Sequence, residues 1–420
     1  MSSTAAGAAV SRCADLDALR GFAMLLGIAL HAALSFFPSP WPVHDVRQSR
    51  WLGLFVVAVH GFRMPLFFLL SGFFTMLVFR RRGLRHLLAR RTSRILLPLL
   101  LGVVTILPLD AAVKRAVGGP ARAAADRFIA EKPAPPVAVV AGRESLAVER
   151  ESLAAGRESW TARYRAFLAS DRFRIPLGGS SWHLFKTPLF DHLWFLWHLC
   201  WLIAAFAAAA RAGCAPTGRW MWWLVPASLI PQSFMGSAFG PDTSVALLPP
   251  PHLLLYYGCF FWFGAAACAA TDGSHAADTA AMAGLGRRWK PLLAMAVIVL
   301  LPAVLVTAAQ RNAATILQPA YAWSMSLGMI GLFHRWFSRP SGTVRWLADA
   351  SYWMYLAHLP LVFLTQFVVR DWPWPVAVKF PLVVAVVTVV LLASYRWLVR
   401  DTLLGRLLDG PRPAAAPVTP

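Results

Sequence analysis

Two ionisable residues in the first apolar stretch of the chain have the types and the spacing of a catalytic pair. Arg20 and His31 lie eleven positions apart among mostly apolar residues. In an α-helix eleven residues return to within about 20° of the same face, so we expect both side chains to point into one cavity, with His31 about 16 Å further along the axis. Asp17, three positions before Arg20, is placed to contact it. Ionisable side chains inside a membrane-spanning helix are costly and usually mark functional sites.

The second apolar stretch carries a similar pair. His60 and Arg63 are three positions apart, and Pro65 is expected to kink or break the helix just beyond them. Broken helices at membrane depth occur where they line a cavity, so we interpret Arg63 as functional and His60 as part of the same binding site. Ser71 and Gly72 let helices approach closely, and Ser71 is also counted as a candidate substrate-binding residue.

Five further polar residues lie at the boundaries of later apolar stretches or inside them. Arg91 and Arg94 are one helical turn apart at a membrane boundary, a spacing at which two guanidinium groups bind a phosphate or pyrophosphate. His192 opens the fourth stretch, where it is placed to face an outward pocket. Tyr355 and His358 are three positions apart in the ninth stretch. This histidine either packs against the tyrosine hydroxyl as a structural pair or lines the cavity.

The composition of the chain requires a membrane. Hydrophobic residues make up 58% of the 420 residues and charged residues only 14%, against about a quarter charged in soluble domains. The apolar runs are long enough to cross a bilayer and are continuous rather than alternating, which excludes a β-barrel. We therefore predict an all-α, polytopic transmembrane bundle of about ten spans. They fall near residues 15–37, 51–79, 95–110, 189–210, 220–235, 252–270, 291–309, 318–336, 347–369 and 379–399.

The distribution of charge predicts that both termini are cytoplasmic. The net charge of +21 comes from Lys and Arg that flank the apolar runs, far more of them on one side than on the other, as the positive-inside rule describes. No recognition helix or stacked-aromatic motif accompanies them, so no nucleic-acid partner is expected. The five cysteines have no CxxC spacing, so neither a metal site nor a disulfide framework is expected.

The predicted spans divide the chain into four segments. Residues 1–110 hold the first three spans, residues 189–399 hold spans four to ten, and residues 400–420 form a cytoplasmic tail rich in Pro and Ala. Residues 111–188 are predicted to form an extracytoplasmic loop. Because Leu146, Leu153 and Trp160 recur at intervals of seven, this loop is expected to contain a short amphipathic helix. We interpret the helix as resting on the membrane or the outer vestibule, with a grip on an acceptor as the alternative.

Four short motifs follow one another along the chain. They are Leu16-Asp-Ala-Leu-Arg20-Gly with His31, Phe67-Phe-Leu-Leu-Ser-Gly-Phe73, Arg91-x-x-Arg94 before Pro98, and Ser351-Tyr-x-x-Tyr-Leu-x-His358. In this order and at these depths they resemble the acyltransferase family 3 membrane proteins, over nearly all spans from residue 15 to residue 399. Within that family, His60-Gly-Phe-Arg63-Met and His192-Leu-Trp-Phe-Leu196 look most like the members that succinylate osmoregulated periplasmic glucans. The 111–188 segment departs from the pattern, since it is longer and repeats Arg-Glu-Ser.

The resemblance implies acyl transfer across the inner (cytoplasmic) membrane. The donor would be a cytoplasmic acyl-CoA, either succinyl-CoA or acetyl-CoA, with no permanently bound cofactor. The acceptor would be a hydroxyl of a periplasmic glucan or another glycan, and membrane lipid surrounds the protein. The essential His and Arg of the family fall on His31 and Arg20, and its cytoplasmic arginine pair falls on Arg91 and Arg94.

The chemistry of acyl transfer suits these residue types. Transfer to a hydroxyl needs a general base, and the tetrahedral intermediate needs positive charge at its oxyanion. We assign His31 as the base or as a transient acyl carrier, and Arg20 with Arg63 as the groups that orient the thioester or stabilise the developing charge. The binding roles follow from depth: Arg91 and Arg94 would bind the phosphates of CoA, His358 and Tyr355 would line the cavity, and His192 would lie near the acceptor.

Two other functions share part of this pattern. One is an O-acetyltransferase of another surface polysaccharide or lipid, which differs only in the acyl group and the acceptor. The other is a proton-coupled transporter, because intramembrane Arg and His beside a proline-broken helix also occur in such carriers. No Asp or Glu lies clearly in the middle of a span and no inverted repeat is evident, so the acyltransferase is preferred.

Overall fold

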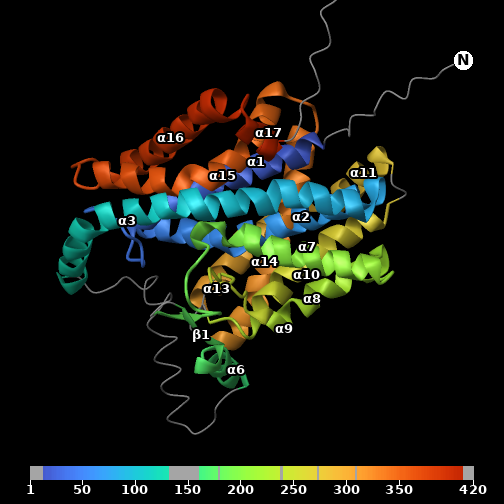
Figure 1. The fold of residues 1–420 in the computed structure, drawn as a ribbon, viewed down its shortest axis with the longest axis horizontal. Coiled ribbons are helices and arrows are strands. Elements are labelled where there is room, and N and C mark those ends of the chain that lie inside the picture. Colours follow the sequence, from blue (N-terminus) through green and yellow to red (C-terminus); the bar gives the residue numbers. More distant parts are fainter. Residues whose placement is uncertain are drawn as a thin grey trace, which may run out of the picture.

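Helices form nearly all of the computed structural model, which describes residues 13–131, 160–177, 180–236, 240–271, 274–307 and 310–409. The long helices lie side by side in one bundle (Figure 1). They are α1 (Ala14–Ala33), α2 (Arg50–Arg91), α3 (Leu97–Glu131), α7 (Trp194–Arg211), α10 (Pro251–Ala269), α14 (Arg311–Phe337), α15 (Gly342–Val369) and α16 (Val376–Ser394). Across these residues the predicted helical bundle is confirmed.

Shorter elements connect the long helices. A single antiparallel hairpin of β1 (Arg174–Leu177) and β2 (Ser180–His183) is the only strand structure within the described ranges. The short helices are η1 (Leu34–Phe36), η2 (Thr92–Leu96), α6 (Trp160–Leu168), η3 (Asp171–Phe173), η4 (Asp191–Leu193), η5 (Gly218–Trp223), α8 (Leu224–Ala227), α9 (Leu229–Gln232), α11 (His275–Leu285), α12 (Trp289–Ala294), η6 (Met295–Leu300), α13 (Leu301–Val306), η7 (Tyr395–Val399) and α17 (Leu403–Asp409).

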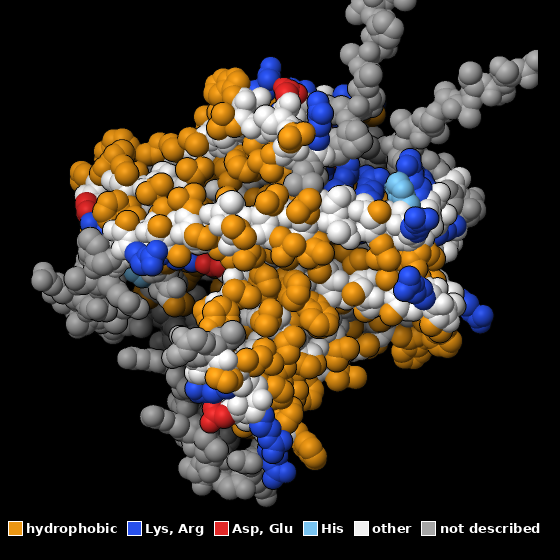
Figure 2. Space-filling view, in the orientation of Figure 1, with side chains coloured by type: hydrophobic (Ala, Val, Ile, Leu, Met, Phe, Trp, Pro, Cys, Tyr) orange, Lys and Arg blue, Asp and Glu red, His pale blue; other side chains and the backbone are white. Residues whose placement is uncertain are grey.

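The surface of the bundle is apolar enough for a membrane. Among the described residues, seven helical segments have the length and composition to cross a bilayer. Hydrophobic side chains cover much of the face in Figure 2, and many of the Lys and Arg side chains lie toward its right-hand end. Apolar surface on this scale needs lipid around it, so the chain is a membrane protein. The segments are Ala14–Phe36, Arg50–Gly118, Asp191–Arg211, Pro251–Ala269, Trp289–Val306, Gly342–Val369 and Val376–Val399.

The number of spans and the side of the termini stay predictions. The segment Arg50–Gly118 contains two of the ten predicted spans, and the predicted span 318–336 lies in α14, which is not among the seven. Residues 220–235 do not form one continuous helix. They form η5, α8 and α9 in sequence, in a stretch where Pro226 and Pro231 each remove a helical hydrogen-bond donor.

The chain reverses direction at Gly83. A guanidinium nitrogen of Arg91 donates a hydrogen bond to the Thr75 hydroxyl at 3.0 Å, although sixteen residues of straight helix would separate the two by about 24 Å. Midway between them, Gly83 has φ 76° and ψ 173°, a conformation that essentially only glycine adopts. This turn brings Arg91 and the following η2 segment back beside the first part of α2.

Pro65 does not break its helix, so that part of the sequence prediction is wrong. The only non-helical backbone inside α2, all of which the structure describes, is at Gly83. A proline ring crowds the carbonyl four residues earlier, which here belongs to Gly61. Residues 64–70 are buried against neighbouring helices, and this packing holds the helix together through the missing hydrogen bond.

The helix α2 packs closely on α10, as the small residues at Ser71 and Gly72 predict. A Cβ atom at Gly72 would collide with the carbonyl of Phe261, and one at Gly264 would collide with the carbonyl of Leu69. The two backbones therefore touch at two levels. This contact fixes the depth at which α2 presents its polar side chains to the interior.

The segment predicted as an extracytoplasmic loop begins as a helix. The helix α3 continues through the predicted boundary at residue 110 and ends at Glu131. Leu146 and Leu153 of the predicted amphipathic helix lie outside the described residues. Trp160 begins α6, which is joined to α10 by a hydrogen bond of 3.0 Å between the Tyr164 hydroxyl and Nδ1 of His252.

Candidate active site

One cavity of about 740 Å³ extends through the bundle between α1, α2, α7 and α15. Its walls carry all ten candidate catalytic and substrate-binding residues that the sequence predicts, although these residues come from five separate stretches of the chain. They are Arg20, His31, His60, Arg63, Ser71, Arg91, Arg94, His192, Tyr355 and His358. The predicted common face of Arg20 and His31 is thus confirmed, because both line the same cavity.

Arginines gather at one end of the cavity. Since α1 packs against the part of α2 that runs in the opposite direction up to Gly83, the start of α1 lies near the turn at Gly83. Arg20 is 3.4 Å from the Asp17 carboxylate, as its spacing predicts, and it also donates to the Ala348 carbonyl at 3.0 Å. Six arginines line this end, namely Arg20, Arg81, Arg82, Arg90, Arg91 and Arg94.

The segment that carries Arg94 has an unusual backbone. Residues Thr92–Leu96 form a π-helical turn between α2 and α3. Such turns are rare and occur frequently at functional sites, because the extra residue re-aims the neighbouring side chains. The hydrogen bond from Arg91 to Thr75 fixes one guanidinium against α2. Both arginines of the Arg91-x-x-Arg94 motif line the cavity, as a phosphate-binding pair requires.

Arg63 lies on the cavity wall without a carboxylate partner. Its Nε atom is buried and has no hydrogen-bond partner in the part of the chain that the structure describes. The acidic residues among the described lining are Asp17 and Asp349. Asp17 contacts Arg20, and Asp349 follows the residue whose carbonyl accepts from Arg20, so both belong to the arginine-rich end. Arg63 therefore presents a buried, unneutralised charge to the cavity.

A glycine on α1 makes room for this guanidinium. A Cβ atom at Gly27 would collide with Nη1 of Arg63. Gly27 lies between Arg20 and His31, one turn before the histidine. The end of the Arg63 side chain is thus packed directly against α1, between the two candidate catalytic groups.

Three histidines cluster at the other end of the cavity. The ring centroids of His31 and His358 are 5.2 Å apart, and those of His358 and His192 are 5.3 Å apart. The Tyr355 hydroxyl donates to the backbone carbonyl of His192 at 2.7 Å rather than to His358. The alternative in which His358 packs against the Tyr355 hydroxyl is therefore not observed, although the two rings are neighbours with centroids 6.4 Å apart, and both residues line the cavity. His358 instead bonds the Tyr355 backbone carbonyl through Nδ1 at 2.8 Å, and the tyrosine side chain fixes η4 to α15.

An indole ring covers His31. The rings of His31 and Trp41 have centroids 5.5 Å apart and planes that differ by 14°. The indole nitrogen donates to the Gln366 side-chain oxygen at 2.8 Å, and the Gln366 amide donates to the backbone carbonyls of His31 and Ala32 at 2.9 and 3.1 Å. Those carbonyls lie in the last turn of α1, where the backbone carbonyls lack the N–H donors that a continuing helix would supply. One glutamine thus fixes both the backbone of His31 and the ring stacked on it.

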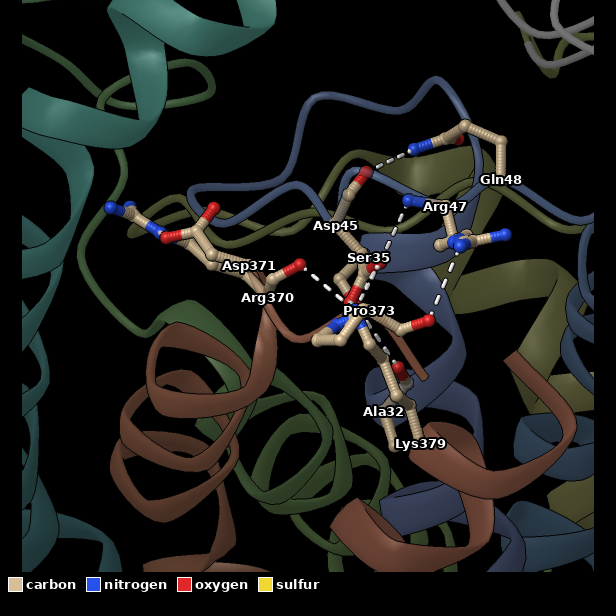
Figure 3. A network of polar contacts seen from close by, with 9 residues as sticks. All are labelled: Ala32, Ser35, Asp45, Arg47, Gln48, Arg370, Asp371, Pro373 and Lys379. Atoms are coloured by element: carbon tan, nitrogen blue, oxygen red, sulfur yellow. Dashed lines mark hydrogen bonds and ion pairs between the residues drawn. The ribbon is translucent and has the colours of Figure 1, made fainter. Parts of the chain in front are cut away.

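The loop that carries Trp41 is anchored by a buried ion pair (Figure 3). Nζ of Lys379 is 2.9 and 3.0 Å from the two carboxylate oxygens of Asp45 and 2.9 Å from the Arg370 carbonyl, and the lysine is fully buried. The Asp45 backbone also donates to the Ser35 carbonyl at 2.9 Å. The connection between α1 and α2 is therefore attached to the connection between α15 and α16.

A family model described as an acyltransferase domain, family 3, matches residues 14–396. The chain belongs to acyltransferase family 3. The match includes every residue of the cavity described above except Cys13 and Leu408. No solved structure matches the chain at a significant level.

Curated relatives of this family 3 acyltransferase match over a shorter stretch. The chain is 39% identical over 88 residues to the glucans biosynthesis protein C of Salmonella typhi and 38% identical over 88 residues to that of Escherichia coli K12. Each match covers 21% of this chain and 23% of the relative. The chain is thus an acyltransferase with a membrane-spanning fold.

The acyltransferase has one further group of potential metal ligands. Asp110, Asp191 and His192 place their ligand atoms within 4.8 Å of one another. Lys114 lies between the two carboxylates, 2.9 Å from Asp110 and in direct contact with Asp191. Because its ammonium group occupies the position that a cation would take, we interpret the group as an internal ion-pair network behind His192.

Sequence reasoning missed three residues of this acyltransferase site. Gly27 is a small residue between Arg20 and His31, but nothing in the sequence identifies Arg63 as its neighbour. Trp41 lies in a loop where tryptophan is ordinary at a membrane interface. Gln366 is an uncharged polar residue 335 positions from His31. Only the tertiary contacts give these residues a role.

Proposed function

We propose that this acyltransferase moves a succinyl group from cytoplasmic succinyl-CoA to a hydroxyl of a periplasmic glucan, within the inner membrane. The observation that carries the proposal is the polarity of the cavity. Six arginines line one end, His31 lies about 16 Å further along α1, and Arg63 presents an unneutralised charge between them. The partial similarity to proteins named glucans biosynthesis protein C supports the choice of acceptor.

The arginine-rich end suits the donor. Coenzyme A carries phosphate and pyrophosphate groups, and guanidinium pairs bind such groups in a bidentate manner. Arg91 and Arg94 would hold these phosphates, while the pantetheine arm reaches along the cavity and places the thioester near His31. The excess of Lys and Arg at this end also agrees with a cytoplasmic location.

His31 would act as the general base. Its imidazole takes the proton of the acceptor hydroxyl while the hydroxyl oxygen attacks the thioester carbonyl carbon, so a C–O bond forms and the carbonyl becomes an oxyanion. Arg20 lies at the arginine-rich end and would orient the donor, whereas Arg63 is the guanidinium near the transfer point, where it faces either this oxyanion or the free carboxylate of the donor. The carbonyl then re-forms, the C–S bond breaks, and the thiolate of CoA receives the proton from the His31 imidazolium. No proton is gained or lost overall.

Arg63 supports the choice of the acyl group. A buried guanidinium without a carboxylate is costly, and a ligand that supplies the carboxylate recovers that cost. In succinyl-CoA two methylene groups separate the thioester carbonyl from a free carboxylate, whereas acetyl-CoA has no free carboxylate. We therefore assign the free carboxylate of the donor to Arg63, which favours succinyl over acetyl transfer.

A deletion strain tests the proposal directly. Periplasmic glucans are analysed by mass from cells that lack the protein and carry either the wild type or His31→Ala at equal membrane levels. The expected result is a succinyl mass increment that only the wild type restores. An acetyl increment would overturn the donor assignment, and unchanged glucans with both proteins would overturn the acceptor. Full restoration by His31→Ala would overturn the role of His31.

A further inference from the structure

A second cavity of about 390 Å³ adjoins the first. Two residues, His60 and Thr243, line both. His60 stands on α2 one turn before Arg63, and Thr243 is exposed on the loop before α10. A group that enters the second cavity therefore reaches the main cavity at the end that holds the histidines, opposite the arginine-rich end.

The wall of this second cavity is fixed by hydrogen bonds. The backbone N–H groups of Leu189 and Phe190 both donate to the Val245 carbonyl, at 2.8 and 2.9 Å. The Tyr257 hydroxyl donates to the Asp242 backbone carbonyl at 3.0 Å, and the Leu248 N–H donates to the Leu184 backbone carbonyl at 2.9 Å. Because the loop is tied to α10 and to the segment before α7, the cavity is preformed.

Its lining has the chemistry of a sugar site. The lining combines hydroxyl, imidazole and carboxylate groups with one phenylalanine ring. The polar groups can form hydrogen bonds with sugar hydroxyls, and the ring can cover the apolar face of a pyranose. Among the described lining residues there is one acid and no Lys or Arg, in contrast to the arginine-rich end. The lining consists of His60, Phe185, Pro241, Asp242, Thr243, Ser244, Pro250, His252 and Leu253.

The shared histidine has a defined orientation. Nε2 of His60 lies 3.1 Å from the Pro241 carbonyl, which only accepts hydrogen bonds, so the proton must be on Nε2. Nδ1 is then an acceptor. A Cβ atom at Gly240 would collide with the His60 ring, and this glycine has φ 72°, so the loop closes directly against the imidazole.

We propose that the second cavity is the acceptor site and that it binds a neutral sugar unit, whose hydroxyl passes His60 to reach His31. The inference rests on the acyl transfer proposed above. The described lining holds no Lys or Arg that could pair with a phosphate or carboxylate of the acceptor, which favours a neutral unit. The two substrates thus enter from opposite ends, the anionic donor at the arginines and the neutral acceptor here.

The test uses the purified full chain in lipid nanodiscs with a linear β-glucan oligosaccharide as probe. Binding is measured by saturation-transfer NMR, which needs no turnover, and the KM values for oligosaccharide and succinyl-CoA are measured separately. Thr243→Trp would fill the junction between the cavities, and Phe185→Ala would remove the aromatic face. Lys186→Trp is the matched control, because this exposed neighbour of Phe185 lines neither cavity.

The expected result is at least a tenfold loss of oligosaccharide affinity in Thr243→Trp and Phe185→Ala, about 1.4 kcal/mol, with the KM for succinyl-CoA unchanged and the control like the wild type. Equal oligosaccharide binding in all four proteins, or none in the wild type, would overturn the acceptor site. Tighter binding of a phosphate-bearing oligosaccharide would overturn the proposed preference of the second cavity for neutral sugars. Binding without transfer would instead count against the proposed function and leave the site standing.

Discussion

The indole ring of Trp41 lies nearly parallel to the imidazole ring of His31, with 5.5 Å between the ring centroids. The same indole bonds Gln366, which in turn bonds the His31 backbone carbonyl. The histidine is therefore restrained from two directions, through its ring and through its backbone. A general base must hold its position to within a few tenths of an ångström, so we interpret Trp41 and Gln366 as positioning residues for His31.

Replacement of Trp41 is expected to lower turnover without weakening donor binding. In Trp41→Ala the His31 ring gains freedom, and a misplaced base costs on the order of 10²-fold in rate. Trp41→Phe keeps a stacked ring but loses the hydrogen bond to Gln366, so its turnover should fall less than that of Trp41→Ala. Steady-state kinetics with succinyl-CoA should show a lower kcat at an unchanged KM. A raised KM for succinyl-CoA with normal kcat would place Trp41 in donor binding instead.

Gly27 offers a second test, with a control on the same helix. In Gly27→Ala the new methyl group would meet Nη1 of Arg63, the far end of a flexible side chain, so the protein can fold while the guanidinium is displaced. At Gly21 a Cβ atom would lie 3.7 Å from Ala348, which is ordinary contact. We expect Gly27→Ala to lose about 10²-fold in kcat/KM for succinyl-CoA and Gly21→Ala to stay near the wild type.

The comparison of these two variants is decisive because both add one methyl group to α1. Their melting temperatures in detergent should be similar, since the methyl group at position 27 meets only the end of a flexible side chain and the one at position 21 makes ordinary contact. Equal kinetics in the two variants would show that the position of Arg63 does not matter for transfer.

The role assigned to Arg63 predicts a change of donor preference. Arg63→Gln removes the charge and keeps hydrogen-bond donors, so the loss should fall on succinyl-CoA far more than on acetyl-CoA. A charge-assisted hydrogen bond to a buried group contributes about 1.5–3 kcal/mol, which corresponds to roughly 10- to 150-fold in the ratio of the two kcat/KM values. The measurement is competition between the two donors with the same acceptor. An equal loss for both would assign Arg63 to the oxyanion rather than to the free carboxylate.

The residues explain why the sequence predicted part of this site and not the rest. Arg20 and His31 could be placed on one face because the geometry of a single helix relates them. Trp41 and Gln366 are related only by the packing of α1 and the loop after it against α15, which no local period encodes. The chain reversal shows the same limit. Pro65 was expected to kink or break its helix, yet burial holds that helix together, and the exposed Gly83 makes a turn that the sequence did not predict.

The turn at Gly83 leads to a prediction about the donor end. A side chain at φ 76° and ψ 173° costs about 1–3 kcal/mol, so Gly83→Ala strains the turn that holds Arg91 against Thr75. We expect a higher KM for succinyl-CoA, with oligosaccharide binding unchanged. Gly284→Ala is the control, because this glycine has an ordinary φ and open space around its Cβ position. An unchanged KM in Gly83→Ala would show that Arg91 does not depend on this turn.

The buried pair of Lys379 and Asp45 predicts a pH-dependent stability. Burial raises the pKa of the Asp45 carboxyl above its usual value. The positive charge of Lys379 acts in the opposite direction, because it favours the charged carboxylate. Lys379→Met leaves the carboxylate buried and unpaired, which costs about 3–5 kcal/mol, and Lys379→Met with Asp45→Asn should recover most of that loss. Because the carboxyl in the folded single variant has a raised pKa, the folded state takes up a proton more readily than the unfolded state. The melting temperature of Lys379→Met should therefore rise as the pH falls toward that pKa, whereas the double variant should show no such rise. A single variant as stable as the wild type at neutral pH would show that the anchor of the Trp41 loop does not depend on this ion pair.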